Sequence, residues 1–115
     1  MARDSVTTQK ITRAGLTPAL TAVSANNDVI DAGSVFLQVA NGSGSSINVT
    51  VNSPVTVDGL TVGPLVVAVG AGATKLIGPF PVATFARPSS SGTDVGRVYV
   101  DYSATTSITR AVVSF

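Results

Sequence analysis

The stretch "FLQVANGSGSSINVTV", residues 36–51, sets two runs of alternating apolar residues around a segment rich in Asn, Gly and Ser. Before the bend, Leu37 and Val39 share one face of an extended chain, and after it Ile47 and Val49 do the same. The pattern predicts two β-strands joined as a hairpin. The long Gly-rich connection indicates a larger loop or a bulge rather than a minimal turn.

Alternation with a period of two continues along most of the chain, where Val, Thr and Ile dominate. Residues 5–15, "SVTTQKITRAG", form one Thr-rich alternating run. Near the C-terminus, "GRVYVDYSA" at 96–104 and "TSITRAVVSF" at 106–115 form two more. The pattern predicts strands over these three segments, with the last two joined as a second alternating pair.

The segment "PLVVAVGAGATKLIG", residues 64–78, contains two further strand candidates about a Gly-rich link. Its first run, "LVVAV", is apolar on both faces, which predicts a central strand. The link "GAGATK" at 70–75 lacks the GxxxxGK[ST] spacing of a phosphate-binding loop, so we interpret it as a hairpin link. Ahead of this segment, Asp58 and Gly59 follow the short run "VTV" and indicate a tight turn.

Two segments are predicted to lie largely outside the sheets. Residues 16–34 allow one helical turn after Pro18, but Asn26, Asn27 and other breakers favour loop over most of their length. Residues 79–94 contain three prolines and a Ser-rich tip, which is typical of a loop excursion.

The length of 115 residues suits a single domain, 1–115, with one hydrophobic core. The candidates amount to about seven or eight short strands with turn signals every ~8–12 residues, which is typical of a single antiparallel β-sandwich or small barrel. Residues 1–9 have two interpretations. They are either an extended arm that becomes ordered on docking, or the first strand of the sandwich.

Hydrophobic residues make up 44% of the chain and charged residues 11%, so Ser, Thr, Asn and Gly are expected to dominate the surface. Neighbouring copies can pack on such a surface without desolvating many ions, which favours assembly. The formal net charge is +1 and no run of like charge occurs, so nucleic-acid binding is not expected. The charged start and the lack of a run approaching ~20 apolar residues predict a soluble protein made in the cytoplasm, with no membrane partner.

The chain lacks His, Cys and Glu, three of the residue types that most often carry acid, base or nucleophilic catalysis. Lys10 and Lys75 lie in alternating patterns and are predicted to face solvent. The segment "NNDVID" at 26–31 is the best candidate for binding calcium, but it lacks the central glycine and closing glutamate of an EF-hand loop. Asx turns are the favoured interpretation of that segment. We expect no enzyme activity, no cofactor and no metal.

The aromatic residues are four Phe and two Tyr. Phe80 and Phe85 flank the Pro-rich excursion, where they either stack on a sugar ligand or plug the open end of a sandwich. Tyr99 and Tyr102 lie among valines, which predicts one ring in the core and one on the outer face. Phe115 places a bulky ring where chains usually fray, so we interpret it as a terminal anchor.

Several of these stretches together resemble a family of small virion proteins of tailed bacteriophages. They are "ITRAGLTPA" at 11–19, the opening stretch at 36–51, "KLIGPFP" at 75–81 and "VYVDYSATTSITRAVV" at 98–113. The resemblance implies an all-β protein that decorates or cements a capsid. It also implies the major capsid protein as partner, a homo-oligomer on the capsid surface, and synthesis in the host cytoplasm.

On this interpretation the protein staples neighbouring capsid subunits through an arm, strand edges and apolar patches. The candidate interaction residues are Arg3, Asp4, Ser5, Val6, Phe80, Phe85 and Phe115. The alternative is a head fibre, neck or adhesion module that binds host-surface glycan through Phe80 or Phe85. An enzyme is the third and least favoured interpretation.

Overall fold

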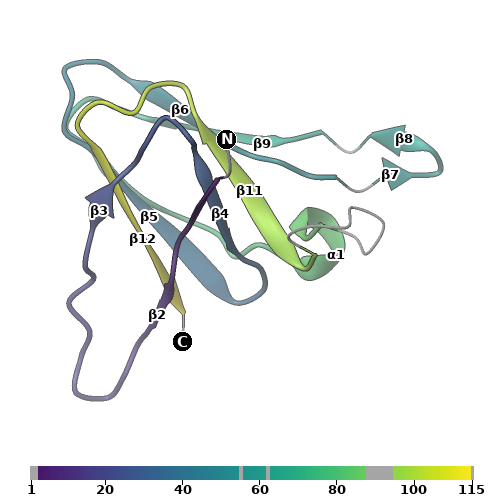
Figure 1. Ribbon diagram of the computed structural model, residues 1–115, viewed down its shortest axis with the longest axis horizontal. Helices are drawn as coiled ribbons and strands as arrows, with labels where there is room; N and C mark the ends of the chain where they lie inside the picture. Colours follow the sequence, from purple (N-terminus) through teal and green to yellow (C-terminus); the bar gives the residue numbers. More distant parts are fainter. Residues whose placement is uncertain (1–2, 55, 62, 88–94, 115) are drawn as a thin grey trace.

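Two five-stranded sheets pack face to face (Figure 1). Buried apolar side chains from both sheets form one core cluster. The computed structural model describes residues 3–54, 56–61, 63–87 and 95–114. Sheet I has the strand order β1 (Asp4–Ser5), β4 (Asp28–Asp31), β11 (Arg97–Tyr102), β6 (Ile47–Val51) and β9 (Leu65–Val69). Sheet II has the order β10 (Thr74–Ile77), β5 (Val35–Asn41), β12 (Ile108–Ser114) and β2 (Thr8–Lys10), and β3 (Thr21–Ala22) also pairs with β12.

The alternating runs of the sequence become strands that turn one face to the core. In β5, Leu37 and Val39 are fully buried while the residues between them are half-buried. In β11, Val98, Val100 and Tyr102 all turn inward, as expected for a single face. The all-β prediction is therefore confirmed, and the arrangement is consistent with a β-sandwich. Within the described residues the chain forms twelve strands rather than seven or eight, because several are only two residues long.

Residues 36–51 do not form the predicted hairpin. β5 pairs with β10 and β12 in sheet II, whereas β6 pairs with β9 and β11 in sheet I. The connection between β5 and β6 therefore crosses from one sheet to the other as an arch. Buried Asn41 holds this arch, because its amide nitrogen donates hydrogen bonds to the carbonyls of Ser45 at 2.8 Å and Val69 at 3.0 Å.

The other two predicted strand pairs are arches as well. β9 lies in sheet I and β10 in sheet II, so residues 70–73 are not a hairpin link. β11 and β12 likewise belong to different sheets. A period of two shows which side chains face the core, but two strands facing each other across a core carry the same pattern as two hydrogen-bonded neighbours.

The strand β9 was predicted to be central and is instead the last strand of sheet I. Its apolar residues do not all face protein, since Val66 is 54% exposed and Leu65 is 40% exposed. A strand that is apolar on both faces is usually covered by protein on both faces, and this is why the sequence predicts a central strand. In β9 the outer face is apolar but remains exposed to solvent.

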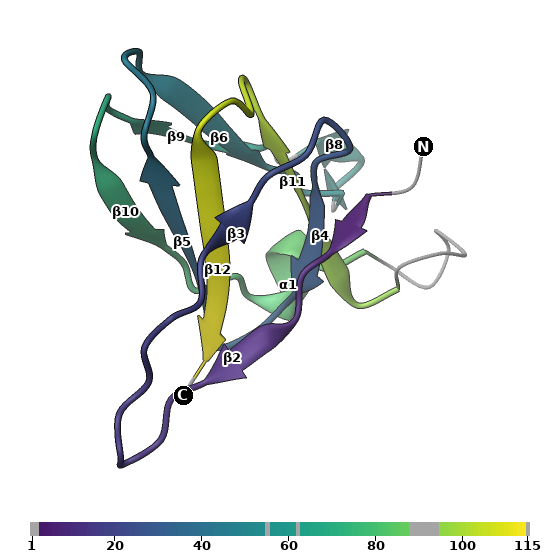
Figure 2. The same cartoon turned by 60° about the vertical axis from the view of Figure 1, so that its left-hand side comes forward.

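Both sheets are mixed rather than purely antiparallel. β1 runs parallel to β4 in sheet I, and β2 runs parallel to β12 in sheet II. Figure 2 shows this N-terminal segment crossing from one sheet to the other, and Val6, between the two strands, is buried at 8% exposure. Residues 3–10 therefore lie within the fold as first strands and not as a free arm.

The segment 16–34 contains two strands, although loop was predicted for most of it. β4 lies between β1 and β11, and its first residue, Asp28, is fully buried. A charged residue such as Asp28 interrupts the apolar pattern by which a buried strand is recognised. Its burial is possible because it pairs with Arg110, which is distant in sequence. The sequence pattern alone contains no signal for that pairing.

Two local predictions concern the connections. Asp58 and Gly59 have φ values of 51° and 78° and join β7 (Thr56–Val57) to β8 (Leu60–Thr61), as the tight-turn prediction requires. The predicted loop 79–94 begins with the short helix α1 (Val82–Phe85), and its part 88–94 lies outside the described residues. No helix in the described part of the chain is long and apolar enough to cross a membrane.

Candidate functional site

The outer face of sheet II carries an apolar groove of about 480 Å³, which we call the sheet II groove. Strand residues that point away from the core supply its floor, and the loop 11–20 supplies one wall. The lining residues are Ile11, Leu16, Pro18, Phe36, Gln38, Leu76, Gly78 and Val113.

The loop 11–20 is held against the sheet by hydrogen bonds at both of its ends. The Ile11 amide donates to the Ser114 carbonyl at 2.8 Å, which continues the pairing of β2 with β12. The side chain of Gln9 both donates to the Ala19 carbonyl at 3.0 Å and accepts from the Ala19 amide at 2.9 Å. Between these points, Gly15 has a φ of 96° and makes the turn.

The groove combines a buried floor with exposed apolar rims. Val113 is only 6% exposed although it lies outside the core cluster, whereas Leu76 is 68% exposed and Ile11 is 42% exposed. These two exposed side chains come from different elements on either side of the floor. An apolar partner seated in the groove would remove both from water, which is the main source of favourable free energy at such a site.

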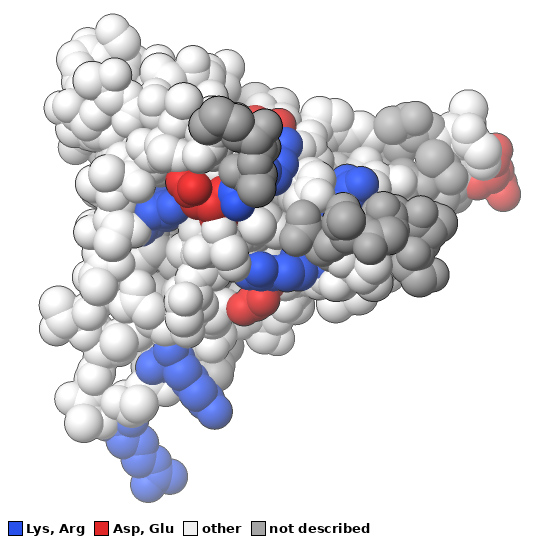
Figure 3. All heavy atoms as spheres, viewed as in Figure 1, with Lys and Arg blue, Asp and Glu red and all other residues white. Residues whose placement is uncertain are grey.

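Two basic residues lie in or next to the loop 11–20, although neither is among the residues that line the groove. Lys10 and Arg13 are both exposed, and neither forms an ion pair with any of the described residues. No carboxylate is present among the lining residues. Figure 3 shows Lys and Arg side chains without neighbouring Asp or Glu at the end of the molecule where β2 and the loop lie. The local field therefore favours a partner with a negative charge.

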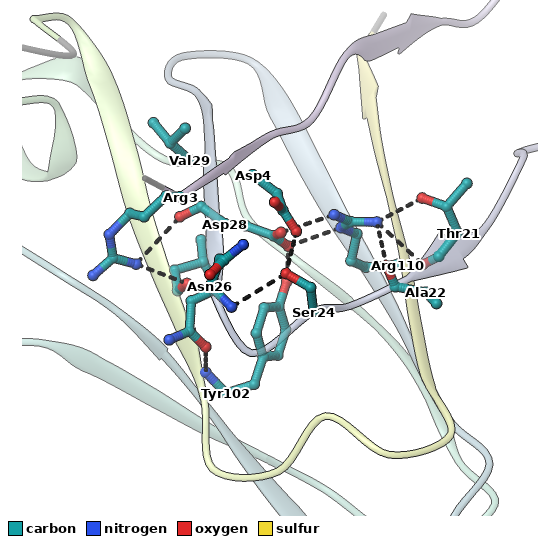
Figure 4. A network of polar contacts seen from close by, with 12 residues as sticks. Arg3, Asp4, Thr21, Ala22, Ser24, Asn26, Asp28, Val29, Tyr102 and Arg110 are labelled. Atoms are coloured by element: carbon teal, nitrogen blue, oxygen red, sulfur yellow. Dashed lines mark hydrogen bonds and ion pairs between the residues drawn. The ribbon is translucent and has the colours of Figure 1, made fainter. Parts of the chain in front are cut away.

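A second cluster of polar groups lies where β4, β11 and β12 meet (Figure 4). Asp28 accepts hydrogen bonds from Arg110 Nε and Nη2, both at 2.8 Å, and from the Tyr102 hydroxyl at 2.6 Å. The remaining Arg110 nitrogen donates to the Thr21 hydroxyl at 2.5 Å and to the carbonyls of Thr21 and Ala22, each at 3.2 Å. We call Asp28, Arg110 and Tyr102 the buried triad.

Protonation of the buried triad is set by burial and by the carboxylate. Burial, followed by the charge of Asp28 and the hydrogen bond to it, raises the pKa of Tyr102 far above its ordinary value. Burial opposes the positive charge of Arg110, but the hydrogen bond and charge of Asp28 outweigh it and raise the pKa of the guanidinium. Since all three groups are occupied by one another, the triad is suited to stabilising the fold rather than to binding a ligand.

The predicted interaction residue Arg3 is half-buried against sheet I. It forms an ion pair with Asp101 at 2.6 Å and donates to the Val100 carbonyl at 3.2 Å. Its guanidinium carbon lies 4.2 Å from the centre of the Tyr99 ring, and that of Arg87 lies 4.3 Å from the same ring. Tyr102 is buried and Tyr99 is half-buried, so the prediction of one core ring and one outer ring is confirmed.

The other predicted arm residues are also engaged within the domain. The Ser24 hydroxyl donates to the Asp4 carboxylate, and Arg97 Nη1 donates to the Ser5 hydroxyl at 2.8 Å. The Val6 amide donates to the Val29 carbonyl at 3.1 Å. Asp4, Ser5 and Val6 therefore each make a hydrogen bond within the domain.

Phe80 and Phe85 pack on each other near α1 instead of presenting exposed rings. Their centres are 5.8 Å apart at an interplanar angle of 83°, which is an edge-to-face contact. Phe80 is fully buried and Phe85 is half-buried against the core. Both rings therefore pack against the core, and the sugar-stacking role of Phe80 and Phe85 stays a prediction. Phe115, the predicted terminal anchor, lies outside the described residues.

The calcium candidate at 26–31 has its carboxylates committed to other partners. Asp28 belongs to the buried triad, and Asp31 accepts from the Thr8 hydroxyl and forms an ion pair with Arg97 at 3.3 Å. Asn27 accepts a hydrogen bond from the Tyr102 amide at 3.1 Å. Among the described residues no group of three or more His, Cys, Asp or Glu side chains lies close enough to hold a metal ion.

Sequence reasoning did not identify the sheet II groove. Most of its lining residues lie within the stretches "ITRAGLTPA" and "KLIGPFP". These stretches resemble phage virion proteins, but their sequence alone does not indicate that they form a common surface. One usable signal is Leu76, which directly precedes the core residue Ile77, so that one of the two must face outward.

Comparison of the chain with protein-family models, with curated proteins and with solved structures finds no match.

Proposed function

We propose that this chain is a structural virion protein that decorates a bacteriophage capsid and stabilises it by binding across capsid subunits. The resemblance of four stretches to small phage virion proteins supports this proposal, as does the all-β fold. The main structural support for the proposal is the sheet II groove, because it supplies an exposed apolar surface suited to a partner protein.

The proposed mechanism is non-catalytic attachment. The chain contains no His, Cys or Glu, and it places apolar side chains such as Leu76 on its surface. A cement protein adds binding free energy across the seams of a shell, and apolar burial provides that free energy without chemical change. A standard interface takes about 800 Å² from each partner, which is a modest part of the 6178 Å² surface of this domain.

The groove also indicates the chemistry of the capsid segment that it binds. Ile11 and Leu76 favour apolar side chains on that segment, and the exposed Arg13 in the loop that forms one wall favours a nearby carboxylate. We therefore propose that the major capsid protein presents an apolar segment with at least one acidic residue to this groove.

The test is to mix the purified protein with capsids and to count the copies bound to each shell. We expect occupancy at many sites on the shell. Leu76→Lys should reduce it at least tenfold, because it places a charge on the apolar rim. Leu60→Lys is the matched control, since Leu60 is 73% exposed on the distant β7–β8 hairpin and should bind as the unchanged protein does.

Absence of binding to any shell would overturn the proposal. Occupancy limited to vertices would replace decoration by the fibre or neck alternative, because the two stoichiometries differ by more than about tenfold on an icosahedral head. Equal binding of the Leu76→Lys protein would exclude the groove as the contact while leaving decoration in place.

A further inference from the structure

The edge of sheet I at β9 is an open pairing surface. Among the described residues β9 is hydrogen-bonded to β6 on one side only, so its other side presents an unpaired row of backbone donors and acceptors. The strand sequence "LVVAV" carries no charge. Leu65, Val66 and Ala68 are exposed along it.

Other sheet edges in this molecule carry features that discourage pairing, and β9 lacks them. Proteins protect edges with very short strands, charged side chains, proline or bulges. β1 is only two residues long, and β10 carries the exposed Lys75. β9 has five residues, without a charge or a proline inside the strand. Compared with β1 and β10, the edge strand β9 is therefore the least protected against pairing with another strand.

We propose that β9 pairs antiparallel with β9 of a second copy of this chain, about a twofold axis at Val67. A twofold axis brings the same strand against itself, so the surface must be compatible with its own copy. An uncharged strand meets this condition, because no like charges are brought together. The two five-stranded sheets then join into one continuous sheet.

The register about Val67 also covers the exposed apolar side chains. It places Val66 opposite Ala68 of the partner copy on the outer face. On the inner face it places Leu65 opposite Val69, which is fully buried at the end of the core. Leu65, which is 40% exposed in the single chain, would then pack beside the core residues of the neighbouring copy. A shift of one residue would turn these side chains to the wrong faces.

The contact is short, so we expect a moderate affinity. Five strand residues span about 17 Å, and pairing over that length buries less than the ~1,200 Å² at the lower end of the standard range for interfaces. A dissociation constant in the micromolar range corresponds to about 8 kcal/mol. Copies held close together on one surface would pair more completely than free copies do. This inference does not depend on the sheet II groove or on the proposed function.

Sedimentation over roughly 1 to 500 µM tests self-association across the expected range. We expect a monomer–dimer equilibrium for the unchanged protein. Val66→Lys combined with Ala68→Lys should weaken it at least tenfold, because the twofold axis gathers four ammonium groups. Leu76→Lys on β10 is the matched control and should leave the equilibrium unchanged, and urea unfolding checks that each variant is folded.

The register is tested with cysteines, because the chain has none of its own. Val66→Cys and Ala68→Cys lie directly opposite in the proposed pair, whereas each lies on a longer diagonal from its own copy. Random pairing of an equal mixture of the two single variants would already give about twice as much mixed disulfide dimer as either symmetric dimer, and the proposed register should raise this ratio well above two.

A monomer at every concentration would overturn the inference, as would a mixed disulfide dimer at or below about twice the yield of either symmetric dimer, which is the ratio of random pairing. If the lysine pair abolishes capsid binding by a protein that remains monomeric, β9 pairs with a capsid strand and not with a second copy. The groove proposal is tested by a different variant, because it fails if the Leu76→Lys protein binds capsids as well as the unchanged protein does. The two proposals can therefore be rejected independently.

Discussion

On one side of the sandwich the N-terminal segment pairs first with β4 and then with β12, whereas on the opposite side β9 and β10 are the last strands of their sheets. We call these the closed side and the open side. The closed side contains the buried triad and the ion pairs of Arg3 and Arg97. The open side has exposed apolar residues and a single basic residue, Lys75.

This difference separates two uses of side chains in one small domain. On the closed side, charges are paired with one another and tie distant parts of the chain together, such as Asp28 and Arg110. On the open side, Leu65, Val66 and Leu76 contribute little to folding because water still reaches them. The buried charges that fix the fold are therefore concentrated on the closed side, whereas the last strands on the open side keep apolar residues available to a partner.

The largest effect is expected from removing one member of the buried triad. Arg110→Met should lower the free energy of unfolding by about 3–5 kcal/mol, because it leaves the fully buried Asp28 as an unpaired charge. Urea unfolding followed by circular dichroism measures this change.

The matched control lies on the open side. Lys75→Met also replaces a basic side chain by methionine, but at an exposed position, and should alter stability by less than about 0.5 kcal/mol. Equal losses of unfolding free energy in the two variants would show that the buried charges do not stabilise the closed side.

A medium effect is expected from one valine on the closed side. Val6→Ala should lower the free energy of unfolding by about 1.6 kcal/mol, because it removes two buried carbon groups at ~0.8 kcal/mol each. Val66→Ala removes the same atoms at a position that is 54% exposed, and should cost less than about 0.5 kcal/mol.

The ratio of these two losses tests how the N-terminal segment lies in solution. If residues 1–9 were a free arm, Val6→Ala would be as mild as Val66→Ala. Guanidinium unfolding of the two variants side by side makes the comparison.

The smallest effect is expected at Tyr102. Tyr102→Phe should cost about 1 kcal/mol near neutral pH through loss of the hydrogen bond to Asp28. Because the pKa of Tyr102 is raised in the fold above the ordinary value of 10.0, the folded protein keeps the phenol proton where the unfolded chain releases it. Stability from this group is therefore complete below pH ~10 and is lost as the pH rises above it.

The Tyr102→Phe variant should accordingly lose stability less steeply than the unchanged protein above pH ~10, by up to about 1.4 kcal/mol per pH unit. Unfolding free energies measured at several alkaline pH values give the two slopes. Identical slopes would mean that Tyr102 is not held in its protonated form by the fold.

Much of the fold could be predicted from alternation, and most of the candidate site could not. The inward faces of β5, β6 and β11 follow directly from the period of two, as at Leu37 and Val100. The groove escaped prediction because it requires the loop 11–20 and β10 to lie on either side of one floor, and these two segments share no local pattern. β4 escaped because its buried Asp28 is stabilised by a residue more than eighty positions away.

By itself, the sequence determined the β-rich fold class, the faces that β5, β6 and β11 turn to the core, and the Asp58-Gly59 turn. These follow from steric preferences and from the hydrophobic effect acting on neighbouring residues. Only the tertiary structure decided that adjacent strands cross between sheets, that β9 is an edge, and that Arg110 meets Asp28. Such choices depend on contacts between residues far apart in the chain, and local alternation is the same whichever partner a strand takes.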